Sequence, residues 1–302
     1  MFVRSRGAQR APFVHRGRTV GRGPSLLVII VLAAVSGMTL VLGGAPSPAR
    51  AAGGQPKAVV IVGPGSGSTS EFLNEGELIA DQAAVAGMAV SRIFHPNATW
   101  KRVKEATLGA NLVVYFGHGN GWPSPYPPFQ EDTKDGFGLN GYEGASQYST
   151  TYYGGNKIRA KLRLADDAVV IIYRACYSAG NGEDGSPIPS QSVAIKRVDN
   201  FAAAFLHPDV GAGVVMAYRT KQWIDFPAGL MLPGRTMDDV FRTPSSKPSW
   251  SMSGWIGTND IFADSVRTSG ARLHLDKHPT LGYSRAVSGS LGLTTDAWRL
   301  GE

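Results

Sequence analysis

Apolar and polar positions alternate along this 302-residue chain in blocks that predict strands and helices in turn. Runs of consecutive apolar residues are typical of strands buried on both faces, and they occupy residues 58–62, 111–116, 168–173 and 213–218, while residues 89–94 also fit a strand. The intervening pattern predicts helices, the second capped by Asn97, over residues 75–88, 98–108 and 193–206. Strands separated by helices imply right-handed crossovers and therefore an α/β fold, whose mostly parallel sheet has helices on both faces.

Two segments interrupt this alternation. Residues 120–155 are rich in Gly, Pro, Tyr and Ser and show no clear period, and so long a loop beside a site is expected to be functional and ordered. From residue 245 onward, short alternating stretches such as residues 271–275 predict a small C-terminal extension of strands and loops. We therefore expect a leader over residues 1–51, an α/β domain over residues 52–244 and an extension over residues 245–302.

The leader has the layout of an export signal. Six arginines precede an apolar run over residues 26–42, and small residues follow as far as Ala49-Arg50-Ala51. This order predicts a secretory signal that is cut before Ala52. The alternatives are an uncleaved membrane anchor, since this run of 17 residues can just span a bilayer, and a buried core helix. In either export case the body is secreted or extracytoplasmic, because the positive flank stays in the cytoplasm.

The formal charge of +7 belongs to the leader. Residues 1–51 contain seven arginines and no acid, so the rest of the chain balances 23 Lys and Arg against 23 Asp and Glu. A neutral body argues against a nucleic-acid partner. A membrane would be involved only through a retained N-terminal anchor, and nothing in the pattern indicates an oligomeric state.

Motifs for cofactors and metals are weak. Residues 63–68 follow a strand as a phosphate loop does, but they lack its Lys-Ser/Thr ending, which favours a plain loop at the strand edge. His274 and His278 would suit zinc on a helix, yet the stretch before them alternates like a strand. Four loop acids could bind calcium, although solvated charges explain them more simply: Asp132, Asp135, Glu183 and Asp184. We expect no metal and no cofactor.

Two predicted strand ends carry the candidate chemistry. One strand runs into Gly117-His118-Gly119, and a later one runs into Arg174-Ala175-Cys176. Groups at the carboxyl ends of neighbouring parallel strands meet in one crevice, so we expect His118 and Cys176 within hydrogen-bonding distance. A thiol needs such a base, or positive surroundings, to become a nucleophile. Because Cys176 is the only cysteine, it forms no internal disulfide, and the alternative is a buried, inert thiol.

Together these strand ends resemble the caspase-like (clan CD) cysteine peptidases, a group that includes caspases, metacaspases, legumains and gingipains. The resemblance covers residues 58–219, and its specific part is Tyr-Phe-Gly-His-Gly at 115–119 and Ile-Tyr-Arg-Ala-Cys-Tyr-Ser at 172–178. It implies a caspase-like three-layer sandwich to which the C-terminal extension is added. It also implies a thiol protease with Cys176 as nucleophile, His118 as base and an oxyanion site at the amides of Gly119 and Cys176.

The resemblance further implies how a substrate is held. Arg174 would line the primary specificity pocket, Arg219 would stand where caspases carry a substrate-contacting arginine, and Tyr218 would flank the substrate. Two arginines aimed at one group would favour an acidic or polar side chain before the scissile bond. The alternative is that both are surface arginines paired with acids such as Asp166 or Asp225.

Three functions remain open at this point. The leading one is an exported cysteine endopeptidase that hydrolyses a polypeptide substrate. Its rival is a catalytically inactive caspase-like domain that binds a peptide or cell-envelope ligand, with Cys176 merely buried. A third is acyl transfer to an amine through the same dyad, which differs in whether amines compete with water for the acyl-enzyme.

Overall fold

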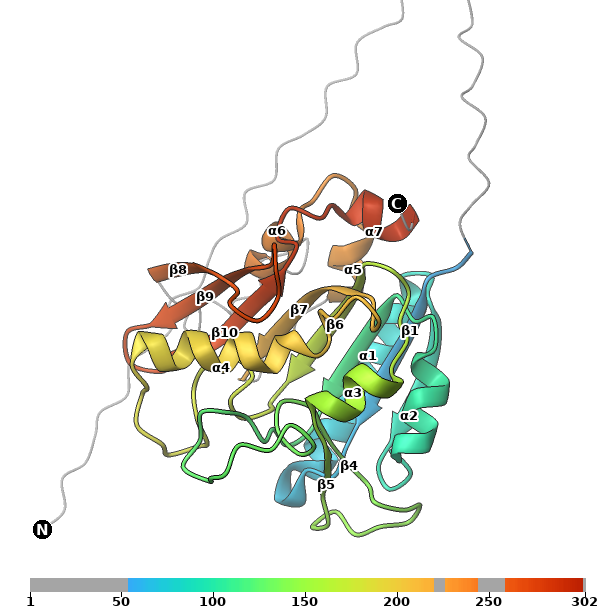
Figure 1. Ribbon diagram of the computed structural model, residues 1–302. Coiled ribbons are helices and arrows are strands. Elements are labelled where there is room, and N and C mark those ends of the chain that lie inside the picture. Colours follow the sequence, from blue (N-terminus) through green and yellow to red (C-terminus); the bar gives the residue numbers. More distant parts are fainter. Residues whose placement is uncertain (1–53, 220–225, 244–258, 301–302) are drawn as a thin grey trace, which may run out of the picture. The chain divides into compact units, whose positions relative to one another are not determined.

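The computed structural model describes residues 54–219, 226–243 and 259–300 (Figure 1). The predicted leader over residues 1–51 and the predicted boundary between residues 244 and 245 lie outside these described residues. Among the helices of the described ranges, none combines the length and the apolar character needed to cross a membrane.

A single eight-stranded sheet forms the centre of the described fold, in the order β2-β1-β3-β6-β7-β10-β9-β8. The first five strands pair in parallel, which confirms the predicted α/β fold with a mostly parallel sheet. They are β2 (Ala89–Phe94), β1 (Lys57–Val62), β3 (Leu112–Phe116), β6 (Ala168–Tyr173) and β7 (Ala212–Tyr218). Strands β1, β3 and β6 are buried almost throughout, because helices cover both of their faces.

Successive residues of the strands supply two separate cores. Val60 and Val62 of β1 point into one core, whereas Val59 and Ile61 point into the other, as the two-residue period of a strand requires. The first core is closed by α1 (Thr69–Val85), α5 (Phe226–Met231), α6 (Met237–Arg242) and α7 (Thr295–Leu300). The second core is closed by α2 (Trp100–Thr107), α3 (Gly155–Lys161) and α4 (Gln191–Ala203). The helices and the sheet between them make three layers (Figure 1).

All three predicted helices have boundaries that differ by one to six residues from those in the structure, and the largest difference is at the start of α1. Helix α1 begins at Thr69, six residues before the expected start, because Phe72 already packs into the first core. It ends beside Gly87, whose φ of +88° is the left-handed conformation that commonly stops a helix. The predicted capping role of Asn97 is wrong: the N-cap of α2 is Thr99, and it makes no side-chain capping bond.

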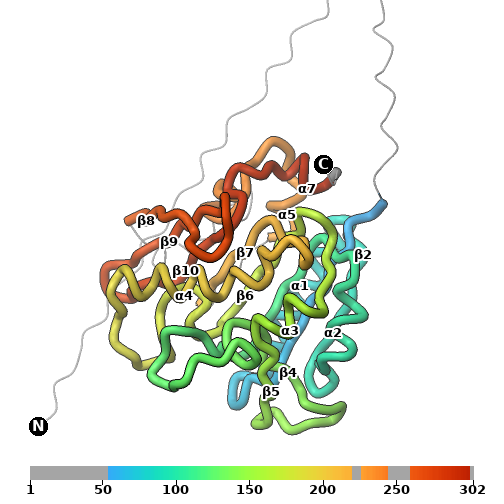
Figure 2. The backbone as a smooth tube through the Cα atoms, viewed as in Figure 1, coloured from blue at the N-terminus to red at the C-terminus, as the bar shows by residue number. Residues whose placement is uncertain are grey.

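The long segment over residues 120–155 folds into a small sheet of its own. Strands β4 (Phe137–Leu139) and β5 (Thr151–Tyr153) pair antiparallel, and the Phe137 ring packs against Tyr115 and Phe205. The backbone trace shows this segment, in green, at the same end of the sheet as the loop that follows β6 (Figure 2). Both loops therefore lie at the carboxyl ends of the parallel strands.

The C-terminal strands continue the main sheet. Strand β10 (Gly282–Gly289) pairs antiparallel with β7, and β9 (Arg272–His278) and β8 (Asn259–Asp264) follow outward. The described part of the predicted extension is thus an integral edge of the sheet. It looked separate in the sequence because its buried positions include polar residues such as His274, Asp276 and Arg285.

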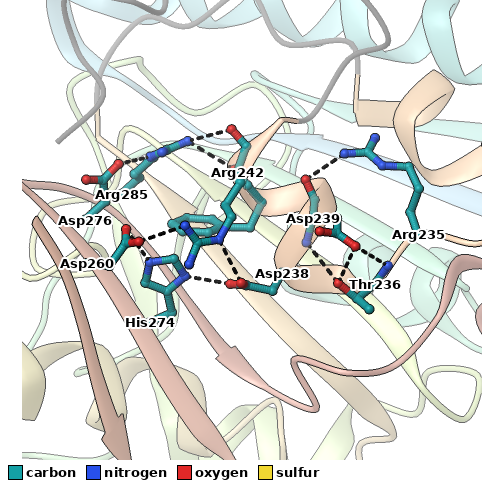
Figure 3. Close-up of polar contacts among 10 residues, drawn as sticks. Arg235, Thr236, Asp238, Asp239, Arg242, Asp260, His274, Asp276 and Arg285 are labelled. Carbon is teal, nitrogen blue, oxygen red and sulfur yellow. Dashed lines mark hydrogen bonds and ion pairs between the residues drawn. The ribbon is translucent and has the colours of Figure 1, made fainter. Parts of the chain in front are cut away.

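Paired charges explain how these polar residues can be buried. Both ring nitrogens of His274 contact carboxylates, Nδ1 with Asp238 of α6 at 2.6 Å and Nε2 with Asp260 of β8 at 2.9 Å (Figure 3). Arg242 bridges the same two carboxylates at 2.8 and 2.7 Å. The network fastens α6 to the outer strands of the sheet, and each buried charge has a partner.

Candidate active site

His118 and Cys176 lie at the carboxyl ends of two adjacent parallel strands. Strand β3 pairs directly with β6, and its last residue, Phe116, is opposite Tyr173. His118 is two residues beyond that pair on one strand, and Cys176 is three residues beyond it on the other. Both side chains are partly exposed, so they are accessible from solvent. The structure thus places the two predicted dyad residues at one edge of the sheet, but the expected hydrogen bond between them is not present: within the described residues, the His118 ring contacts Ser66 instead.

A third side chain reaches the same edge from β1. The Oγ of Ser66, in the short 3-10 helix η1 (Ser66–Ser68), lies 3.2 Å from Nε2 of His118. Chain connections run outward in opposite directions from β1 and β3, which makes this the topological switch point of the sheet. The sequence analysis missed Ser66; the signal that would have found it is the strand order, which puts the loop after β1 beside the loop after β3.

The Tyr115 hydroxyl holds the backbone under the His118 ring. It accepts the N–H of Gly138 at 2.8 Å, and it lies 2.9 Å from the carbonyl oxygens of His118 and Gly138. The side chain is completely buried, and this burial raises the pKa of the phenol. Tyr115 therefore remains a neutral hydrogen-bonding group that ties the loop after β3 to strand β4.

Gly119 brings two backbone segments of the candidate site into direct contact. A Cβ placed on Gly119 would lie 2.1 Å from the carbonyl oxygen and 2.6 Å from the nitrogen of Cys176. No side chain fits there, so only glycine allows the loop after β3 to approach the loop after β6 this closely. The two amides predicted to form an oxyanion site are consequently near neighbours.

The surroundings of the dyad favour its neutral forms. Burial raises the pKa of the Cys176 thiol, the positive charge of Arg219 lowers it, and the negative charges of Asp184 and Glu183 raise it further. Burial also lowers the pKa of His118, against a smaller raising effect of Glu183. At neutral pH the resting site therefore contains a thiol and an uncharged imidazole.

Arg174 is engaged within the protein. Its guanidinium donates to Glu71 Oε2 of α1 at 3.1 Å and lies over the Phe72 ring, 5.3 Å from the ring centroid. The residue adopts a φ of +63°, and its N–H donates to the Tyr218 carbonyl at 2.7 Å. Arg174 follows the predicted alternative of pairing with an acid, although its partner is 103 residues away along the chain.

Arg219 and Tyr218 have different surroundings, although they are neighbours in the chain. Arg219 donates to Oδ1 of Asp184 at 2.7 Å, and Asp184 belongs to the same loop after β6 as Cys176. The Tyr218 ring is fully buried among aromatic side chains, which include Phe226 and Phe241. In this conformation the Tyr218 side chain offers no surface to a substrate, whereas Arg219 stays within electrostatic reach of the thiol.

A pocket of about 360 Å³ adjoins the candidate dyad. Residues from the loops after β3 and β6 line it, among them Gly119, Asn120, Tyr126, Lys134, Tyr152 and Glu183. Gly119 belongs both to this pocket and to the contact with the Cys176 backbone, so a group bound here would lie near the loop that carries the thiol.

Within residues 54–219, 226–243 and 259–300, no group of three or more His, Cys, Asp or Glu side chains could hold a metal ion. The chain shows no significant match to any protein-family model, curated protein or solved structure. The function must therefore be argued from the residues of the site themselves.

Proposed function

We propose that this chain is an exported cysteine endopeptidase of the caspase-like type, with Cys176 as nucleophile and His118 as its base. One observation carries the proposal: the carboxyl ends of adjacent strands β3 and β6 bring His118 and Cys176 to one edge of the sheet, with Gly119 against the Cys176 backbone. The three-layer α/β arrangement and the export-type leader are consistent with it.

The proposed reaction starts from the neutral pair. As the Cys176 sulfur attacks the peptide carbonyl carbon, His118 accepts the thiol proton, and the carbonyl oxygen becomes an oxyanion. The amides of Gly119 and Cys176 are the candidate donors to that oxyanion, each worth about 3–4 kcal/mol in comparable sites. His118 then protonates the leaving amine, which leaves an acyl-thioester on Cys176. Water attacks this thioester, His118 takes up and returns the proton, and the free acid departs.

Ser66 has a supporting role in this scheme. Its hydroxyl lies next to Nε2 of His118 and can hold the ring in one orientation. Nδ1 of His118 has no hydrogen-bond partner within the described ranges and is the ring atom free to carry the proton in transit. Activated nucleophiles are usually paired with a base whose orientation is fixed by a third group.

The proposal is tested with the purified full-length chain, a thiol-directed alkylating probe and a mixed peptide library. We expect Cys176→Ala to abolish labelling and cleavage, and His118→Ala to slow both sharply. His207→Ala is the matched control, because the His207 side chain is partly exposed and its ring contacts the nearby Asp209. Equal labelling in wild type and His118→Ala would refute the dyad.

The pH profile of labelling adds an independent check. Since the pKa of the Cys176 thiol is raised and that of His118 is lowered, labelling should increase steadily into the alkaline range. A labelling rate that is already maximal at pH 6 would indicate a preformed thiolate and contradict the neutral resting pair. Cleavage without labelling of Cys176 would move the proposed nucleophile elsewhere.

A further inference from the structure

The pocket next to Gly119 contains an acid that lacks a positive partner. Glu183 lines it from the loop after β6, and its carboxylate accepts a hydrogen bond from the Tyr126 hydroxyl at 3.0 Å. No arginine, lysine or histidine of the described ranges forms an ion pair with Glu183. Lys134 is within electrostatic reach of Glu183 but forms no ion pair with it, so this partly buried carboxylate has unused hydrogen-bonding capacity for a cation.

The other charged groups nearby are already engaged. Lys134, which lines the same pocket, is 4% exposed, and its ammonium donates to Ser124 Oγ at 3.1 Å and to the Tyr126 carbonyl at 3.0 Å. Arg219 is paired with Asp184. The guanidinium of Arg174 lies against Glu71. Thus both arginines that the sequence had assigned to a substrate carboxylate are in ion pairs, whereas Glu183 forms none within the described residues.

We propose that this pocket binds a cationic side chain of the substrate, lysine or arginine, with Glu183 as its charged partner. The inference rests on the proposed peptidase function and deepens it by naming the substrate class. It replaces the acidic preference that Arg174 and Arg219 had suggested. Because Gly119 lines the same pocket and touches Cys176, the bound side chain belongs to a residue close to the scissile bond.

The position of Glu183 also connects the pocket to the nucleophile. Its negative charge contributes to the raised pKa of the Cys176 thiol. A lysine or arginine in the pocket would neutralise that charge and make the thiolate easier to form. A correct substrate would therefore assist its own cleavage, and an acidic one would add to the negative field around the sulfur.

The test compares peptides that differ only in one residue beside the cleaved bond, on either side: Arg, Lys, Gln or Asp. In wild type we expect kcat/KM to be about tenfold or more higher for Arg and Lys than for Gln, as suits a charge-assisted contact, and lower still for Asp. Glu183→Gln should remove this preference, so that the Arg, Lys and Gln peptides are cleaved with similar kcat/KM. Glu143→Gln is the control, since Glu143 is an exposed acid paired with Arg102 and lies outside the pocket lining.

A preference for Asp, or a preference for Arg and Lys that survives in Glu183→Gln, would overturn the inference. If no peptide is cleaved, the peptidase proposal fails, and a second measurement still decides the pocket. The rate at which iodoacetamide alkylates Cys176 is then measured with and without N-acetyl-arginine amide. Acceleration in wild type that is absent in Glu183→Gln supports a cation site; no change in wild type rejects it.

Discussion

The buried ion pair of the C-terminal strands offers a sharp test of how the sheet edge is held. Arg285 of β10 donates through Nε to Asp276 of β9, and their side chains are 4% and 0% exposed. Nη1 of Arg285 also donates to the Phe241 carbonyl at 3.1 Å, at the end of α6. We expect Arg285→Met, which keeps the aliphatic volume and removes the charge, to destabilise the fold strongly.

The magnitude follows from what the variant leaves behind. Asp276 would remain buried as an unpaired carboxylate, and the Phe241 carbonyl would lose a donor. Removing one partner of a buried pair typically costs about 3–5 kcal/mol, whereas replacing both partners with apolar groups is often neutral. The double variant Asp276→Leu/Arg285→Met should therefore be more stable than Arg285→Met alone.

Urea unfolding of the full-length chain, followed by circular dichroism at pH 7, measures these free energies of unfolding. Arg272→Met is the matched control, because Arg272 lies in the adjoining strand and its contact with Asp264 is 3.4 Å long and exposed. An exposed pair contributes about 0–1 kcal/mol, so this variant should resemble wild type. The reasoning fails if Arg285→Met costs less than about 1 kcal/mol, or if the double variant is as unstable as the two single changes added together.

Two further predictions concern the loops around the candidate site. Burial raises the pKa of Asp135 from an ordinary 3.8 to about 7, so the folded state keeps a proton that the unfolded chain loses, and stability falls as the pH rises through that window. Asp135→Asn should therefore be more stable than wild type at pH 8, by up to about 4 kcal/mol, with no difference near pH 4; a gain independent of pH in urea unfolding would contradict this. Tyr115→Phe removes the hydroxyl that holds the carbonyl of His118 and the N–H of Gly138. It should lower the free energy of unfolding by about 1–3 kcal/mol and also slow the alkylation of Cys176; unchanged alkylation would restrict Tyr115 to a structural role.

The parallel half of the sheet was predictable because its strands obey a simple local rule. Strands β3 and β6 are almost wholly apolar, since helices cover both faces, and their predicted bounds match the structure within one residue. The order of these strands along the chain also implied that His118 and Cys176 would share one edge. The local pattern was sufficient to predict these strands because the burial of each of their residues follows from its own polarity.

The antiparallel half did not follow from the sequence because its burial depends on pairs. Strand β10 is buried throughout although it contains Arg285 and several small polar residues, and this is tolerable only because Asp276 neutralises the arginine. His274 is likewise buried between Asp238 and Asp260, which come from two other elements. No local period reveals a partner that is 14 or 36 residues distant.

The same dependence on distant partners decides how the candidate site recognises charge. Taken alone, Arg174 and Arg219 indicate an anionic substrate, because an arginine near a nucleophile has strong hydrogen-bonding capacity for a carboxylate. In the fold Glu71 and Asp184 occupy that capacity, and Glu183 forms no ion pair among the described residues. The specificity that we propose is therefore the reverse of the one inferred from residue types alone. The field acting on a ligand comes from the charges left unpaired. At this pocket they are the carboxylate of Glu183 and the ammonium of Lys134, and the ammonium is already hydrogen-bonded to neutral oxygens.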